Sequence, residues 1–186
     1  MLTREEVLKV IDACTNSRDK AIISLLYDAS ARPVDLREMR WKDVQFDDDG
    51  AMIHTSAKTG KERKIRLTPI SLSYLAQWKS DYPGDPTGEN YVFVSLREYE
   101  SAARTHIPVE NTAFLRLIRT LRQRTGIQKL KPSIFRPSRI THDVADGYDL
   151  QYLMLKNWGS LKSSMIEYTR NPARSIYRNM PLKRQG

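Results

Sequence analysis

The sequence has one cysteine, no long apolar segment and no long run of a single charge. Because Cys14 is the only cysteine among the 186 residues, an intrachain disulfide and a cysteine-rich zinc site are both excluded. No stretch is long enough to span a membrane, and the N-terminus has no apolar segment like that of a secretory signal. We therefore expect a cytoplasmic protein that does not associate with membranes.

Sequence signatures of several other function classes are also missing. The hairpin segment that contains Gly60-Lys61 has no earlier glycine of the kind that a Walker A loop requires. The acidic residues do not form the cluster of a two-metal nuclease. Neither an RNP-like aromatic strand nor a GXXG loop is present, so an RNA-binding or ribosome-associated function rests on charge alone. We expect no metal ion and no nucleotide cofactor.

The positive charge of the chain is its strongest compositional feature. Thirty-one Lys and Arg residues stand against 22 Asp and Glu residues, which gives a net charge of +9 and an isoelectric point near 9.7. Such a chain favours a polyanionic partner, because each phosphate that it neutralises releases condensed counterions. A hydrophobic fraction of 40% is enough for a core, and the length fits one domain.

Apolar periodicity predicts a mostly helical fold with a small antiparallel β-sheet, an α+β class. Alternation in residues 44–46, 52–55 and 64–67 indicates two or three strands. Helical spacing predicts a first helix after Thr3, which fits a capping box with Glu6, and further helices at about 18–29, from Pro33, and at 70–80, 111–125, 138–146, 150–156 and 162–168. Residues 82–89 should form a loop, and residues 91–94 a short strand or a buried turn.

Three basic segments are candidates for phosphate binding. Arg32 follows an apolar helix, although it could simply pair with Asp28 or Asp35 on the surface. Lys58 lies near the tip of the predicted hairpin, which could also be an ordinary solvated basic turn. Arg136 follows two apolar residues that should anchor its backbone while its head group reaches a cleft.

The order of these segments resembles the tyrosine recombinase family, the phage-type integrases. That family has an arginine after an apolar helix, a lysine on a hairpin, an H-x-x-R box, a His or Trp, and a tyrosine. The matching residues are Arg32 in Ser-Ala-Arg-Pro-Val-Asp-Leu, Lys58, Arg136 in Ser-Ile-Phe-Arg, Trp158 in Asn-Trp-Gly-Ser, and Tyr168 in Met-Ile-Glu-Tyr-Thr. The pattern is similar to archaeal and phage-like members, in which Trp-Gly often replaces Gly-His.

The resemblance implies a role for each matching residue. Tyr168 would be the nucleophile, Arg32 and Arg136 would hold the scissile phosphate, Lys58 would be the general acid, and Trp158 would donate a hydrogen bond to a phosphate oxygen. Asp35 would help to hold the first arginine. A second, less favoured nucleophile is Tyr177, and the residues expected to contact DNA outside the site are Lys61, Arg63 and Arg139.

One position departs from the family pattern. Ser133 stands where the family usually has the histidine of H-x-x-R, and a hydroxyl can donate a hydrogen bond but is a poor base near neutral pH. His142 could substitute, although a structural role fits its place on the following helix better. The departure motivates an alternative hypothesis, a DNA-binding integrase relic with impaired catalysis.

The resemblance also implies the organisation and the partner of the chain. Residues 1–186 would form a single catalytic domain with the fold of that family, without the N-terminal core-binding domain, and residues 171–186 would be a basic tail. The partner would be double-stranded DNA, cleaved and rejoined without a cofactor in site-specific recombination or integration. The family implies a homotetramer on DNA, whereas this domain alone could be a monomer.

Overall fold

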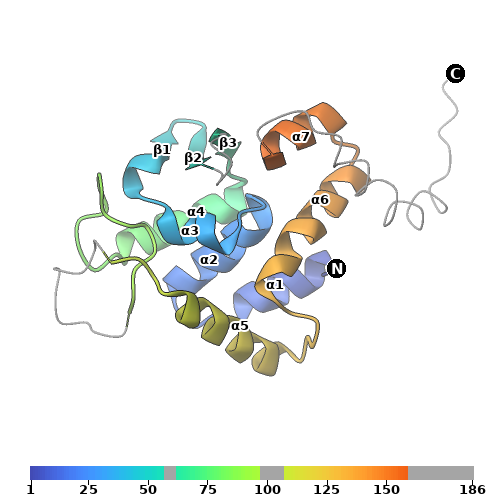
Figure 1. Cartoon of the computed structure of the whole chain (residues 1–186), viewed down its shortest axis with the longest axis horizontal. Coiled ribbons are helices and arrows are strands. Elements are labelled where there is room, and N and C mark those ends of the chain that lie inside the picture. Colours follow the sequence, from blue (N-terminus) through green and yellow to red (C-terminus); the bar gives the residue numbers. More distant parts are fainter. Residues whose placement is uncertain (57–61, 97–106, 159–186) are drawn as a thin grey trace, which may run out of the picture.

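The computed structural model describes residues 1–56, 62–96 and 107–158 (Figure 1). In chain order, the elements are α1 (Arg4–Asp12), α2 (Ser17–Asp28), α3 (Pro33–Glu38), the 3-10 helix η1 (Trp41–Asp43), β1 (Val44–Asp47), β2 (Gly50–Ser56), β3 (Glu62–Arg66), α4 (Pro69–Ser80), α5 (Asn111–Thr125), the 3-10 helix η3 (Pro132–Ile134), α6 (Phe135–Ala145) and α7 (Leu150–Trp158). None of the helices within these ranges is both long and apolar enough to cross a membrane.

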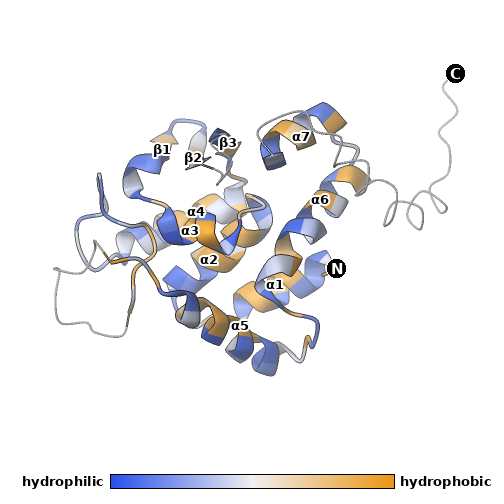
Figure 2. Ribbon diagram, in the orientation of Figure 1, coloured by the Kyte–Doolittle hydropathy of each residue, from blue (hydrophilic) through white to orange (hydrophobic). Residues whose placement is uncertain are grey.

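Helix α2 is the centre of the hydrophobic core. Its residues Ile22, Ile23, Leu25 and Leu26 are at most 1% exposed, because α1, α3, α4 and α6 all pack against it. Figure 2 shows hydrophobic residues along α2 and on the neighbouring α3, while hydrophilic residues lie on much of the outer helices. The central helix therefore fixes the relative positions of α3 and α6, the two helices that begin next to Arg32 and at Phe135.

The first helix begins as its capping signal predicts. The Thr3 hydroxyl accepts a hydrogen bond from the Glu6 backbone N–H at 3.1 Å, and the Glu6 carboxylate accepts one from the Thr3 backbone N–H at 2.8 Å. Just before this cap, the Leu2 backbone N–H donates to the Ser138 hydroxyl of α6 at 2.9 Å. The start of α1 is thus joined to a helix that lies more than a hundred residues later in the sequence.

The sheet has the strand order β1-β2-β3, and both pairings are antiparallel. Ile53 in the middle strand is opposite Val44 on one side and Ile65 on the other, and these three side chains are buried. The β1–β2 turn ends at Gly50, whose φ of +127° disfavours residues with a Cβ. The predicted alternation is confirmed, and with it the α+β class.

One predicted boundary differs from the structure, and one alternative that the sequence leaves open is decided. Helix α6 begins at Phe135 instead of Ser138, because Pro137 lies in the first turn, where a missing backbone N–H costs no helical hydrogen bond. Residues 91–94 form a buried segment with isolated bridges from Tyr91 to Arg40 and from Val94 to Pro108, which fits the predicted buried turn and not the alternative of a short strand. The earlier start of α6 places Arg136 inside the first turn of a helix.

Candidate active site

Arg32 lies at a sharp turn between α2 and α3. Helix α2 ends at Asp28, and Ser30 then adopts a left-handed conformation with φ of 48°. The exposed Arg32 is the N-cap residue of α3, and Pro33 occupies the first helical turn. The Arg32 backbone N–H donates to Asp35 Oδ2 at 3.0 Å, so the carboxylate three residues later fixes the backbone that carries the guanidinium.

Arg136 reaches from α6 into this same turn. Its backbone is anchored beside Phe135, which is fully buried. Its Nη1 donates to the Ser30 carbonyl at 3.0 Å, across 106 residues of sequence, and its Nη2 donates to the Asn157 carbonyl at 2.6 Å. The head group of Arg136 therefore lies against the turn that presents Arg32, because Ser30 precedes Arg32 by two residues.

A third guanidinium, that of Arg63 on β3, lies beneath this pair. Its side chain is 1% exposed, and Nη2 is 2.6 Å from Asp35 Oδ2. Its Nη1 donates to the Asn157 carbonyl at 3.3 Å, the same oxygen that accepts from Arg136. Burial lowers the pKa of the Arg63 guanidinium, Asp35 opposes this shift, and the nearby positive charge of Arg32 adds to it.

The burial of Arg63 is inconsistent with the prediction that it contacts DNA at the surface. The sequence did carry a signal for this burial, because Arg63 and Ile65 are two residues apart in β3 and so lie on the same face of the strand. Both side chains point inward. Asp35 also differs in detail from its predicted role. Its carboxylate holds the backbone of Arg32 while it forms an ion pair with the guanidinium of Arg63.

Trp158 is the last residue of α7 and contacts Arg136. The Cζ atom of Arg136 lies 5.3 Å from the centroid of the indole ring, within the range of a cation–π contact. The preceding residue, Asn157, is buried and supplies the carbonyl that both Arg63 and Arg136 contact. The structure thus places Arg136 next to both the turn that carries Arg32 and the indole ring of Trp158.

Four other predicted residues lie outside the described residues. Lys58 and Lys61 belong to the segment between β2 and β3, and Tyr168 and Tyr177 follow α7 in the sequence. Ser133 is described, and it lies exposed in η3, three residues before Arg136. The nucleophile and the general acid therefore remain predictions from the sequence.

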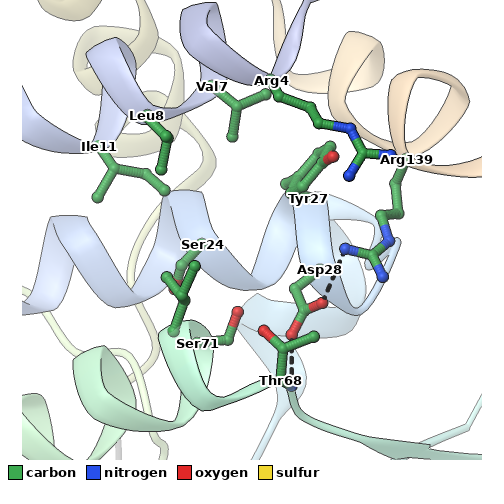
Figure 3. Close-up of a pocket in the computed structure, with 11 residues that line it drawn as sticks. Arg4, Val7, Leu8, Ile11, Ser24, Tyr27, Asp28, Thr68, Ser71 and Arg139 are labelled. Carbon is green, nitrogen blue, oxygen red and sulfur yellow. Dashed lines mark hydrogen bonds and ion pairs between the residues drawn. The ribbon is translucent and has the colours of Figure 1, made fainter. Parts of the chain in front are cut away.

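Arg139 lies in a different environment from the one predicted. Its side chain is 15% exposed, and it forms ion pairs with Asp28 of α2 at 3.2 Å and with Asp143 at 2.7 Å. Figure 3 shows it turned toward Asp28, which also accepts a hydrogen bond from the Thr68 backbone N–H, at the edge of a cavity of about 250 Å³ between α1, α2 and α4. A guanidinium with two acidic partners joins α2 to α6 and is poorly placed for DNA contact.

His142 is also engaged away from the arginines. Its Nδ1 lies 2.7 Å from the Tyr27 hydroxyl, and the two rings meet edge to face. Burial lowers the pKa of the imidazole, and the positive charges of Arg4 and Arg139 act in the same direction. These contacts support the structural role for His142 and not a substitution for the missing histidine.

The arrangement can neutralise a phosphate. Arg136 places its guanidinium against the turn that carries Arg32, and guanidinium groups match the geometry of phosphate oxygens. The acidic residue of this cluster, Asp35, is already paired with Arg63. Among the residues that the structure describes, no group of three or more His, Cys, Asp or Glu side chains is arranged to hold a metal ion.

Comparisons with known proteins identify the family of the chain. The model of the phage integrase family matches residues 1–174, so the chain belongs to that family. Tyrosine recombinase XerA of Pyrococcus furiosus is 29% identical over 178 residues, which cover 94% of this chain and 58% of XerA. Transposase A from transposon Tn554 of Staphylococcus aureus is 26% identical over 162 residues, which cover 82% of this chain and 43% of the transposase. The predicted membership of the tyrosine recombinase family is confirmed.

Solved structures show the same fold. The crystal structure of XerA recombinase matches with a TM-score of 0.77 at 23% identity, covering 95% of this chain and 63% of that one. XerH site-specific recombinase, bound to its palindromic difH substrate, matches with a TM-score of 0.71 at 16% identity, covering 95% and 52%. The chain spans about half the length of the curated relatives reported above.

Proposed function

We propose that this chain is the catalytic domain of a site-specific DNA recombinase, which cleaves and rejoins DNA strands through a 3′-phosphotyrosine intermediate. The observation that carries the proposal is the contact of the Arg136 guanidinium with the Ser30 carbonyl, two residues before Arg32. The guanidinium of one arginine thereby lies against the turn that carries the other, although the two are far apart in the sequence. A scissile phosphodiester placed there would be held from two sides.

The two arginines would stabilise the transition state. As the nucleophile attacks, negative charge builds up on the non-bridging oxygens of the phosphorane, and preorganised cations lower the barrier because they need not reorient. The carbonyls of Ser30 and Asn157 each accept a hydrogen bond from Arg136, which fixes the plane of its guanidinium before DNA arrives. Loss of either arginine should reduce the cleavage rate about 100- to 1,000-fold, as for the loss of an oxyanion-hole donor.

The remaining roles concern protons and the covalent bond. Tyr168 would attack the phosphorus atom, forming the phosphotyrosine bond while the bond to the 5′ oxygen breaks. Lys58 would give a proton to that oxygen, which leaves as a free 5′-hydroxyl. Trp158 would donate its indole N–H to a non-bridging oxygen, and the Ser133 hydroxyl could add a second donor. Because the phosphotyrosine conserves the bond energy, rejoining requires no ATP, and the arginines supply the charge that a metal ion would otherwise supply.

Double-stranded DNA is the proposed partner. The net charge of +9 suits a polyanion, and XerH site-specific recombinase, which has the same fold, was solved bound to its difH substrate. Basic residues outside the site, with Lys61 among them, would hold the backbone without reading its sequence. We further propose a cytoplasmic protein that assembles as a homotetramer on DNA.

Covalent capture from a pool of DNA sequences tests the proposal, because it does not require a defined target site. The chain is incubated with duplexes that carry a randomised segment and a nick, so that the cleaved end diffuses away and the adduct persists. DNA that remains attached under denaturing conditions is sequenced, and the attached peptide is identified by mass spectrometry. We expect an adduct on Tyr168 that disappears in Tyr168→Phe and persists in the matched control Tyr177→Phe.

The alternative function, a DNA-binding relic, predicts a different result. It is favoured by the exposed Ser133 at the position where the family usually has a histidine. A relic would bind duplex DNA in a salt-dependent manner but would give no adduct from any member of the pool. An adduct on Tyr177 would instead support the proposed reaction and identify Tyr177, and not Tyr168, as the nucleophile.

A further inference from the structure

The most completely buried charged side chain at the site is Arg63, which does not face the proposed position of the phosphate. Its side chain is 1% exposed and that of Asp35 is 3% exposed. A buried guanidinium needs several acceptors, because it loses five hydrogen bonds to water. Arg63 has two acceptors that the structure describes, Asp35 Oδ2 at 2.6 Å and the Asn157 carbonyl at 3.3 Å, whereas its Nε has no hydrogen-bond partner among the described residues.

Each acceptor of Arg63 belongs to a segment that carries one of the phosphate-facing residues. Asp35 Oδ2 also accepts the backbone N–H of Arg32 at 3.0 Å. The Asn157 carbonyl also accepts from Arg136 at 2.6 Å, and the next residue is Trp158. Arg63 therefore joins the first turn of α3, through Asp35, to the end of α7, and it does so beside the link that Arg136 makes between the Ser30 and Asn157 carbonyls.

Stability alone is a weak reason to place this ion pair inside the protein. A buried pair can often be replaced by apolar side chains of similar volume without loss of stability, because desolvation offsets most of the attraction between the charges. Arg18 provides a comparison within the same chain. It lies 2.6 Å from Asp19 and donates to the carbonyl of Val94, but its segment is not part of the arginine cluster.

We infer that Arg63 is a positioning residue for the proposed phosphate transfer, which sets the separation of Arg32 from Arg136 and Trp158 by binding Asp35 and the Asn157 carbonyl together. The inference rests on the proposed function, since it assigns Arg63 a part in that reaction. A displacement of about 1 Å at a reacting group can reduce a rate about 100-fold without a comparable change in ground-state binding. Arg63 thus acts on the cleavage step through its neighbours and does not touch DNA.

Three variants of Arg63 separate positioning from charge balance and from folding. Arg63→Lys keeps a positive charge for Asp35, but an ammonium group cannot replace the planar fork that spans both acceptors. Arg63→Met removes the positive charge. The double variant Arg63→Met with Asp35→Leu removes both members of the ion pair, so no uncompensated carboxylate stays buried. The matched control is Arg18→Met, which breaks an ion pair of the same 2.6 Å length away from the site.

For each variant, the rate constant of single-turnover cleavage is measured on the captured nicked DNA at saturating protein. The dissociation constant for the same DNA and the folded fraction of the variant are measured in parallel. We expect Arg63→Lys and Arg63→Met to fall about 100-fold in the cleavage rate constant per folded molecule, with dissociation constants within about threefold of wild type. Arg18→Met should cleave within about threefold of wild type.

Two results would overturn the inference. Folded Arg63 variants that cleave at the wild-type rate would show that the contacts of Arg63 do not set the site. A loss of cleavage that follows the folded fraction in every variant, with the double variant included, would make Arg63 a stability residue only. Failure of the wild-type chain to form any adduct would instead reject the proposed function, so the two failures are distinguishable.

Discussion

The backbone of Ser30 provides a quantitative test of how the turn before Arg32 is built. Ser30 follows the C-cap of α2 with φ of 48°, a left-handed conformation in which a Cβ costs about 1–2 kcal/mol. Glycine is the usual residue at this position of a helix end, because it has no Cβ. The Ser30 hydroxyl is in addition buried without a hydrogen-bond partner among the described residues. We predict that Ser30→Gly stabilises the fold.

The size of the effect follows from two opposing contributions. Removal of the Cβ relieves about 1–2 kcal/mol, while the greater freedom of glycine in the unfolded chain costs roughly 0.5–1 kcal/mol. Loss of an unpartnered buried hydroxyl adds a further favourable contribution. The net expectation is a gain of about 1 kcal/mol, which corresponds to a rise in Tm of about 2–4 °C for a domain of this size.

Thermal unfolding of three proteins tests this expectation. Wild type, Ser30→Gly and Ser30→Ala are compared by calorimetry at one pH and one salt concentration. Ser30→Ala removes the hydroxyl but keeps a Cβ in the left-handed conformation, so it should gain less than Ser30→Gly. A Tm for Ser30→Gly at or below that of wild type would refute the claim that this turn is strained.

Three further predictions concern stability. Burial raises the pKa of the Cys14 thiol from 9.0 to about 12. Between these two pH values the unfolded chain releases the thiol proton while the folded chain keeps it. The free energy of unfolding should therefore be unaffected by this group below pH 9 and should fall as the pH rises toward 12. Urea unfolding at about pH 8 and about pH 11 should therefore show a smaller alkaline loss in Cys14→Ala, and an unchanged loss would contradict the shift. Lys156 and Asp143 form a buried ion pair 3.1 Å apart, and Asp143 also pairs with Arg139. Asp143→Ala should therefore lower the free energy of unfolding by about 3 kcal/mol and Lys156→Met by only about 1 kcal/mol. Equal losses in denaturant unfolding would reject this arrangement. Thr3→Ala should lose about 1 kcal/mol by removing the N-cap of α1, measured in the same way, and a neutral result would show that the cap is dispensable.

Much of the fold could be predicted because local chemistry determines it. The capping box at Thr3 predicts where α1 begins, and the acidic turn before Gly50 separates two strands with alternating apolar residues. The start of α6 is harder to predict, because Pro137 suggests a boundary before the helix although a proline is tolerated in a first turn.

The site could be predicted only in part. The order of Arg32, Arg136 and Trp158 predicts a shared site, and Arg136 does lie next to the turn of Arg32 and next to Trp158. The groups that hold Arg136, however, are backbone carbonyls, which carry no signal in the identity of a side chain. The inward direction of Arg63 follows from its position on the same face of β3 as Ile65, but the charge of its side chain favours a prediction of surface exposure.

The interior position of Arg139 was not predictable from local pattern. Its two acidic partners, Asp28 and Asp143, lie on different helices, and Asp28 comes from α2, more than a hundred residues earlier. Sequence spacing along α6 indicates only that Asp143 is one turn away. The tertiary packing of α2 against α6 decides that this guanidinium pairs inside the protein and not with a DNA backbone.

The central claim is that Arg32 and Arg136 act on one phosphate, and a double-mutant cycle on the cleavage rate tests it most directly. Arg32→Ala, Arg136→Ala and the double variant are compared in single-turnover cleavage, with duplex binding measured in parallel. If both guanidinium groups hold the same phosphorane, each single change costs about 100- to 1,000-fold and the double change costs far less than the product, since the losses are not additive within one unit. Losses that multiply in full, or that arise entirely from weaker DNA binding, would contradict the account.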